Sequence, residues 1–135
     1  MKILVDTSVW SLALRRDEQQ NAGYRVALAE LIEDGRVVML GCIRQELLSG
    51  VKGLVQFRKL RDRLRPFADL DLTEEDYEEA ASCFNRCRAA GVQGSNTDFL
   101  ICAVCLRRDM PIFTTDKDFG HYAKVLRVKL LPDLI

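Results

Sequence analysis

The chain begins with a short apolar run that an acidic residue ends, and this pattern constrains the fold more than any other. Ile3, Leu4 and Val5 follow one another without a polar residue, and Asp6 comes next. Such a run, with no alternation of polar and apolar residues, is typical of a strand buried on both faces of a sheet. Because both faces then need cover, the rest of the chain must supply helices.

Strand-like and helix-like patterns alternate along the sequence. Strands are predicted over 3–5, 37–40, 67–72, 111–114 and 125–131. Helical patterns cover 9–14, 26–32, 43–48, 54–65, 74–87, 98–108 and 119–123, with a polar turn over 17–20. Strands that alternate with helices predict a three-layer α/β/α sandwich with a central, mainly parallel sheet.

Several helix starts and faces can be predicted in more detail. We expect Thr7 or Ser8 to cap the first helix, and Asn96 or Thr97 to cap the apolar helix over 98–108. Thr73 opens a helix with a capping box. The apolar stripe of that helix is predicted at Tyr77, Ala80, Ala81, Phe84 and Cys87.

Composition indicates one globular domain over 1–135. The 135 residues are 48% hydrophobic, which is enough for an ordinary core without metal or disulfide staples. The longest apolar runs are far shorter than a bilayer span, and the first residues have no signal-peptide pattern. Lys plus Arg and Asp plus Glu both count 20, so bulk charge does not favour nucleic-acid binding.

The five cysteines are an odd number and indicate reduced thiols in a cytoplasm. Cys83, Cys87, Cys102 and Cys105 have a spacing that suggests zinc. They lie on apolar helical stripes, however, where cysteine behaves as a small buried hydrophobe, so we do not expect a zinc site.

Four acidic residues lie beside apolar runs. Asp6 and Asp116 each follow a predicted strand, at the edge where sites form in parallel sheets. Glu46 and Asp98 lie on helices and are expected to point inward, toward the apolar faces of those helices. Burial of unpaired carboxylates is costly, so their presence needs an explanation.

A pocket that held all four carboxylates would favour a hard divalent cation, because their mutual repulsion otherwise raises their pKa values. Mg²⁺ or Mn²⁺ in such a pocket suits hydrolysis of a phosphodiester. Hydroxyls beside the two strand-end acids could support this chemistry; they belong to Thr7, Ser8, Thr114 and Thr115.

Each acid also has an ordinary structural explanation. Asp98 could stabilise the N-terminus of its helix through the helix dipole. Glu46 could be a glutamate at the rim that pairs with Arg44 or with a neighbour. Asp118 is expected to cap the short helix over 119–123 rather than to act as a ligand.

Four sequence blocks resemble the motifs of PIN-domain nucleases, in that family's order and over almost the whole chain. The blocks are Val5-Asp6-Thr7-Ser8-Val9-Trp10, Arg44-Gln45-Glu46-Leu47-Leu48-Ser49-Gly50, Asp98-Phe99-Leu100-Ile101-Cys102-Ala103 and Thr114-Thr115-Asp116-Lys117-Asp118-Phe119. The resemblance is greatest to the small VapC-type toxins. The family usually has alanine where Cys102 stands.

The resemblance implies an endoribonuclease that requires Mg²⁺ or Mn²⁺ and acts as the toxin of a type II toxin–antitoxin pair. It implies a VapB-like antitoxin partner and a homodimer. Asp6, Glu46, Asp98 and Asp116 would take the acidic catalytic positions, with the three aspartates as metal ligands. Asp118 would be an outer contributor, and Thr7, Ser8 and Thr115 would support the site.

Charge is unevenly distributed along the chain. The segment 52–65 carries six basic residues against the single acid Asp62, a net charge of +5, whereas 71–79 carries six acids and no base. We interpret Arg58, Lys59 and Arg61 as candidate RNA-binding residues, because Arg and Lys neutralise phosphates. A solvated helix face is the alternative explanation.

Two other functions remain open on the sequence. A catalytically silent PIN-like binding module would keep the fold without the chemistry. A magnesium-dependent phosphatase with Asp6 as nucleophile would also use the end of the first strand. Haloacid dehalogenase-type phosphatases, however, have a second aspartate two residues later, where this chain has Ser8.

Overall fold

The computed structural model describes residues 1–14 and 22–131, so the polar turn predicted over 17–20 lies outside the described residues. This part of the chain forms three strands and seven helices. They are β1 (Ile3–Val5), α1 (Thr7–Leu14), α2 (Ala22–Glu33), β2 (Val37–Val38), α3 (Gly41–Leu48), α4 (Leu54–Leu64), α5 (Glu74–Ala89), α6 (Asn96–Arg108), β3 (Ile112–Phe113) and α7 (Asp118–Leu126).

The sheet is parallel, with β1 between β2 and β3. Ile3 pairs with Val37, and Leu4 pairs with both Val38 and Ile112. The three residues of β1 are at most 2% exposed, as the apolar run predicts. The central position explains why the first strand of the chain has no polar residue, since it has neighbours on both edges and cover on both faces.

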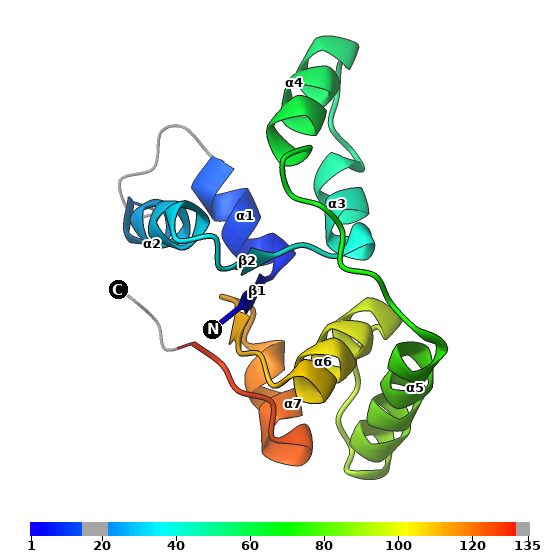
Figure 1. Ribbon diagram of the computed structural model, residues 1–135. Coiled ribbons are helices and arrows are strands. Elements are labelled where there is room, and N and C mark those ends of the chain that lie inside the picture. The colour runs from blue at the N-terminus through cyan, green and yellow to red at the C-terminus, as the bar shows by residue number, and fades with distance from the viewer. Residues whose placement is uncertain (15–21, 132–135) are drawn as a thin grey trace.

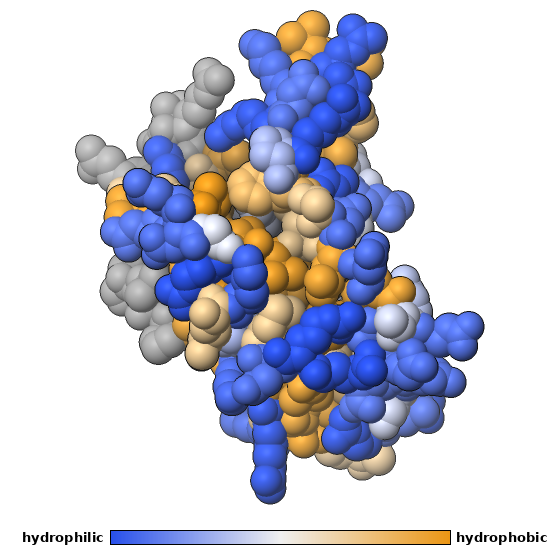
Figure 2. Space-filling view, in the orientation of Figure 1, coloured by the Kyte–Doolittle hydropathy of each residue, from blue (hydrophilic) through white to orange (hydrophobic). Residues whose placement is uncertain are grey.

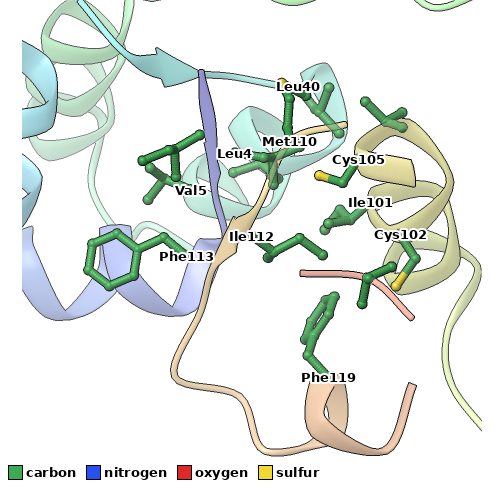
Figure 3. Packing of buried hydrophobic residues seen from close by; sticks show 14 of the residues in the cluster. Leu4, Val5, Leu40, Ile101, Cys102, Cys105, Met110, Ile112, Phe113 and Phe119 are labelled. Atoms are coloured by element: carbon green, nitrogen blue, oxygen red, sulfur yellow. The ribbon is translucent and has the colours of Figure 1, made fainter. Parts of the chain in front are cut away.

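Helices cover both faces of the sheet (Figure 1). Figure 3 shows Phe113 and Ile112 on opposite sides of β3, with Ile112 directed toward α6. On the other side, the ring of Phe113 lies 6.1 Å from that of Tyr24 on α2. Adjacent residues of one strand therefore contact different helical layers, and the predicted three-layer α/β/α sandwich is confirmed.

The predicted strand over 67–72 is wrong as an extended strand. Only an isolated parallel bridge joins Asp69 to Met39, with the Leu70 amide donating to the Met39 carbonyl at 2.9 Å. The Arg44 guanidinium donates a hydrogen bond to the Phe67 carbonyl and forms an ion pair with Asp69 at 2.9 Å. The Phe67 carbonyl is therefore bound to a side chain and not to a neighbouring strand.

The predicted strand over 125–131 is also wrong in its first half. Helix α7, predicted over 119–123, runs to Leu126 and ends at Arg127, which has a left-handed φ of 63°. Leu130 alone then bridges to Ile112. The helix continues because Phe119, Tyr122 and Leu126 form one buried face, which is a helical and not a strand periodicity.

The buried face of α5 differs from the predicted stripe. Tyr77 is 57% exposed, whereas Asp76 is fully buried and shares the inner face with Ala80, Cys83 and Cys87. The predicted capping box is present, with the Thr73 amide donating to Asp76 Oδ2 at 2.8 Å. Because the Asp76 carboxylate is buried, the inner face of α5 begins one residue earlier than the apolar stripe predicted from hydropathy.

Two arginines from the end of α6 pair with the buried Asp76. Arg108 donates to both carboxylate oxygens, at 2.7 and 2.8 Å, and Arg107 donates to Oδ1 at 2.5 Å. These bonds to Arg108 hold the pKa of Asp76 well below its usual range, against the opposing effect of burial. The start of α5 is thereby fixed to the end of α6.

The cysteines behave as core residues. Cys83, Cys87, Cys102 and Cys105 are at most 2% exposed, and Figure 3 shows Cys102 and Cys105 on α6 within the core. Burial raises the pKa of the Cys105 thiol to about 12, and raises that of Cys102 as well. Thiols in this state are protonated and unreactive at neutral pH.

None of the described helices has both the length and the apolar composition needed to cross a bilayer.

We predict that Asp76→Asn destabilises the protein by about 3 kcal/mol at pH 7, because it leaves two arginines without their buried anion. The native pKa of Asp76 is depressed, so this contribution is complete above the ordinary pKa of about 3.9. It is lost as the pH falls toward the native pKa. Urea unfolding of both proteins should therefore give a constant difference from pH 7 to 5 and a smaller one below pH 4.

The matched control is Asp62→Asn, since Asp62 pairs with Arg61 but keeps 61% of its side-chain surface exposed. We expect it to change the free energy of unfolding by less than about 1 kcal/mol. An Asp76→Asn protein as stable as the control would contradict the structural role of this ion pair.

Candidate active site

Asp6 is the most buried of the four acids predicted for the site, with 6% of its surface exposed. Its Oδ2 accepts hydrogen bonds from Thr114 Oγ1 at 2.8 Å and from Ser8 Oγ at 3.0 Å. Its own amide donates to the Phe113 carbonyl at 2.9 Å. The carboxylate at the end of β1 is therefore held by the segment that follows β3.

The hydroxyls of Ser8 and Thr114 can bind the Asp6 carboxylate because neither of them caps a helix. The Asp6 carbonyl accepts the first amide bonds of α1, from Val9 at 3.1 Å and from Trp10 at 3.3 Å, so the predicted capping role of Thr7 or Ser8 is wrong. The two hydroxyls instead lie 3.3 Å apart, between β1 and β3.

The described hydrogen bond of Thr115 in this region comes from its backbone and not from its hydroxyl. Its backbone amide donates to Ser8 Oγ at 3.1 Å. The next amide, that of Asp116, donates to Thr114 Oγ1 at 3.0 Å. The Ser8 and Thr114 hydroxyls thus fix the backbone of the loop that carries Asp116.

Glu46 is exposed and lies at the rim of the site, so the prediction that it points inward is wrong. Thr7 Oγ1 donates to Glu46 Oε1 at 3.3 Å, which joins the start of α1 to α3. The alternative pairing with Arg44 is absent from the described contacts, because that guanidinium binds Asp69 and two backbone carbonyls. Glu46 therefore keeps its carboxylate available at the edge of the site.

Asp98 is half-buried in the first turn of α6. Ser95 is the N-cap of that helix, one residue before the predicted Asn96, and its hydroxyl accepts from the Asp98 amide at 3.1 Å. Asp98 Oδ2 accepts a hydrogen bond from the Tyr122 hydroxyl at 2.7 Å. The backbone and one carboxylate oxygen of Asp98 are both fixed.

Asp116, and not Asp118, makes the side-chain contact at the start of α7. Asp116 Oδ1 accepts from the Asp118 amide at 2.9 Å, so Asp116 stabilises the start of α7 and Asp118 does not cap it. Both side chains are exposed. Asp118 lines a small cavity of about 260 Å³, together with Gln93, His121 and Tyr122.

The carboxylates lie close enough to affect one another's protonation. Partial burial raises the pKa of Glu46, the Thr7 hydroxyl opposes this, and the charges of Asp6 and Asp98 raise it further. Burial also raises the pKa of Asp98, and the charges of Asp6 and Asp116 add to the increase. Anionic charge from four elements of the fold therefore converges at the carboxyl ends of the strands.

These donors fit a hard divalent cation by their chemistry, since all are carboxylates that repel one another. Within residues 1–14 and 22–131, however, no three acidic, histidine or cysteine side chains are arranged closely enough to chelate an ion together. The charges converge, but the described side chains do not close on one point.

The basic residues proposed for RNA contact lie on a separate part of the molecule. Arg58, Lys59 and Arg61 belong to α4, which packs on α3 and projects from the body of the protein (Figure 1). Figure 2 shows a mostly hydrophilic outer surface there. Among the described contacts, no hydrogen bond or ion pair joins these three residues to the four acids.

A larger cavity, of about 730 Å³, lies at the opposite edge of the sheet. It is lined by residues that precede β1 and β3 and by residues at the end of β2. Its lining includes Lys2, Val38, Met39, Leu70 and Met110. It contains none of the predicted site residues, so size alone would misplace the site.

Tyr122 is the contact residue that the sequence analysis missed. It lies on the apolar face of α7 with Phe119 and Leu126, so its periodicity indicates core. The available signal was its hydroxyl, because a buried tyrosine usually finds a hydrogen-bond partner.

The fold and the carboxylate edge define a class of α/β protein with an acidic site at the carboxyl ends of a parallel sheet. The family model of the PIN domain matches residues 3–125. The chain therefore belongs to the PIN-domain family. No curated protein sequence matches it significantly.

Solved structures share the fold over nearly their whole length. FitAcB from Neisseria gonorrhoeae has a TM-score of 0.78 and 22% identity, covering 96% of both chains. VapBC2 from Rickettsia felis, bound to a DNA fragment from its promoter, has a TM-score of 0.78 and 16% identity, covering 97% of this chain and 98% of its own. VapBC-1 from nontypeable Haemophilus influenzae has a TM-score of 0.72 and 15% identity, covering 99% and 98%.

We predict that Asp98→Asn stabilises the protein in the presence of EDTA. The native pKa of Asp98 is raised, so its ionised form opposes folding at neutral pH, and a neutral amide removes that cost. Asparagine can still accept the hydrogen bond from Tyr122. We expect a gain of about 1 kcal/mol, or roughly 3 °C in the melting temperature at pH 7.5.

Asp34→Asn is the control, because Asp34 is an exposed acid outside the site. It should leave the melting temperature unchanged. A lower melting temperature for Asp98→Asn would show that the charge at this position stabilises the metal-free fold.

Proposed function

We propose that this PIN-domain protein is an endoribonuclease that depends on Mg²⁺ or Mn²⁺ and acts as the toxin of a type II toxin–antitoxin pair. The observation that carries the proposal is the proximity of Asp6, Glu46, Asp98 and Asp116, where burial first, and then the charges of neighbouring carboxylates, raise the pKa of Glu46 and of Asp98. Perturbed carboxyls at the edge of a parallel sheet are typical of an active site. Residues 1–135 form the single domain that carries this activity.

Asp6, Asp98 and Asp116 are the residues that would hold the cation. Asp6 and Asp98 each have Oδ2 bound by hydroxyl donors within the protein, so each keeps Oδ1 for a ligand. When bound there, a divalent cation supplies Lewis-acid polarisation of the phosphate and lowers the pKa of a water.

Glu46 takes the attacking water's proton in this proposal. It is exposed at the rim, and the Thr7 hydroxyl holds one oxygen and leaves the other free. Its raised pKa makes the carboxylate a better proton acceptor than an ordinary glutamate. Asp118, exposed beside the cavity that Gln93 and His121 line, is placed to contribute from outside this set.

The phosphatase alternative fits the structure less well. An aspartyl nucleophile must reach the phosphorus, but Asp6 is 6% exposed and two hydroxyls hold one of its oxygens. The hydroxyl of Ser8, where a dehalogenase-type phosphatase has its second aspartate, serves to orient Asp6. A silent binding module is the remaining alternative, and loss-of-charge variants distinguish it.

The likeness of the fold to VapBC and FitAB proteins supports an antitoxin as partner. In this proposal the partner is a VapB-like protein, and the toxin forms a homodimer. The protein acts in the cytoplasm, where its five cysteines stay reduced.

We predict that Asp6→Asn abolishes RNA cleavage, with a loss of at least about a hundredfold, because it removes the charge that two hydroxyls orient. Asp98→Asn should do the same, and excess EDTA should stop the wild-type reaction. The measurement is single-turnover cleavage of total RNA, with folding checked by circular dichroism and Asp34→Asn as the control.

The same variants test the toxin role in cells. Expression of the wild type should arrest growth, a small protein encoded beside it should relieve the arrest, and Asp6→Asn should be harmless. Full activity of both site variants, or of the wild type in EDTA, would eliminate the metal-dependent mechanism. A folded wild type that neither cleaves RNA nor arrests growth would favour the silent binding module.

We predict that reversing Arg58, Lys59 and Arg61 to glutamate weakens RNA binding by at least tenfold near 0.1 M salt. Each lost phosphate contact should also reduce the slope of log affinity against log salt by about 0.7. Fluorescence anisotropy with labelled RNA in EDTA measures both quantities without cleavage.

Lys129→Glu is the control for this experiment, because Lys129 is 64% exposed and lies outside α4. Equal affinity and salt slope for the wild type and the triple variant would make the basic surface of α4 a solvated face with no role in RNA binding.

A further inference from the structure

The hydrogen bond between Tyr122 and Asp98 joins a core residue of α7 to a proposed metal ligand. Tyr122 is 1% exposed, and its hydroxyl donates to Asp98 Oδ2 at 2.7 Å. We propose that Tyr122 is a positioning residue, which holds Asp98 so that Oδ2 is occupied within the protein and Oδ1 faces a divalent cation. This inference rests on the proposed function and names a residue that the PIN motifs of the sequence do not include.

The direction of the bond is fixed by the chemistry of the two groups. A tyrosine phenol has an ordinary pKa of about 10, so at neutral pH the Tyr122 hydroxyl is protonated and donates. The carboxylate can only accept. Asp98 therefore has one oxygen committed to the protein at neutral pH.

The aromatic ring that carries the hydroxyl has little freedom to move. The ring of Phe99 lies 5.0 Å from that of Tyr122, and the ring of Phe119 lies 5.2 Å away in an edge-on arrangement. Phe99 and Phe119 are themselves at most 1% exposed. Since Phe99 follows Asp98 directly in α6, the same helical turn provides both the ligand and part of the ring's support.

The loop before α6 leaves just enough room for this arrangement. A Cβ atom on Gly94 would lie 2.7 Å from Tyr122 Cζ and 2.9 Å from Phe99 Cζ, and still closer to the Tyr122 hydroxyl. Real Cβ atoms essentially never show such contacts, so a side chain at position 94 must shift the tyrosine, Phe99 or the loop itself. Gly94 therefore contributes to the positioning of the Tyr122 hydroxyl, although it lies in the loop before α6.

The hydroxyl can be removed with little change in packing, because Tyr122→Phe keeps the ring. If Tyr122 positions Asp98, this variant should bind Mn²⁺ at least about tenfold more weakly than the wild type, as is usual when a partner of a metal ligand is lost. Isothermal titration of the full chain with Mn²⁺ alone measures the affinity without RNA. In cleavage assays at limiting Mn²⁺, kcat should fall while the KM for RNA stays the same.

Tyr77→Phe is the matched control, since Tyr77 lies on α5, is 57% exposed and makes no described hydrogen bond. Its Mn²⁺ affinity should equal that of the wild type. Gly94→Ala provides a second variant, which keeps the hydroxyl but displaces it, and it should also weaken Mn²⁺ binding. If Tyr122→Phe does not fold, Gly94→Ala decides the question.

A folded Tyr122→Phe protein with wild-type Mn²⁺ affinity overturns the inference, because Tyr122 would then serve only to pack the core. If the wild type binds Mn²⁺ and cleaves RNA, that result leaves the proposed function intact. If the wild type itself shows no saturable Mn²⁺ binding, both the inference and the metal-dependent function are wrong. Weaker binding by Tyr122→Phe and Gly94→Ala, with an unchanged Tyr77→Phe, supports the inference.

Discussion

The carboxylate of Asp6, at the end of the central strand, is the group on which the rest of the candidate site depends. It is nearly buried, and such a charge is tolerated only with hydrogen-bond partners. The hydroxyls of Thr114 and Ser8 donate these hydrogen bonds. The Thr114 hydroxyl also accepts a hydrogen bond from the Asp116 amide, which fixes the loop that carries Asp116. One buried carboxylate thus ties the ends of β1 and β3 together and places a second acid.

The candidate site combines two acids held by hydrogen bonds with two exposed acids. Asp6 and Asp98 have fixed oxygens, whereas Glu46 and Asp116 are exposed to solvent. The fixed acids suit a role in holding a ligand in one position, and the exposed Glu46 suits exchange of a proton with water. The repulsion among these charges opposes folding, and the buried pairing of Asp76 with Arg107 and Arg108 stabilises the helices that carry the site.

Asp76 and Asp6 show why sequence patterns find some acids and miss others. The motif blocks single out Asp6, Glu46, Asp98 and Asp116, and the structure brings their charges together. Asp76 lies in the acidic run over 71–79, yet it is fully buried, because Arg107 and Arg108 pair with it. These two partners are more than thirty residues away in the sequence. Contacts of that range leave no trace in local periodicity.

The sequence by itself determined the order of the elements, the buried central strand and the acids at the strand ends, because these depend on local runs of apolar residues. Tertiary structure decided which hydroxyls bind Asp6, that Glu46 lies at the rim, that segments 67–72 and 125–131 form only single bridges, and that Tyr122 contacts Asp98. The physical reason is that these outcomes depend on which groups meet after folding. A hydroxyl or carboxylate forms a hydrogen bond with the group that lies nearest to it in space. The neighbouring residues in the sequence do not reveal which group that is.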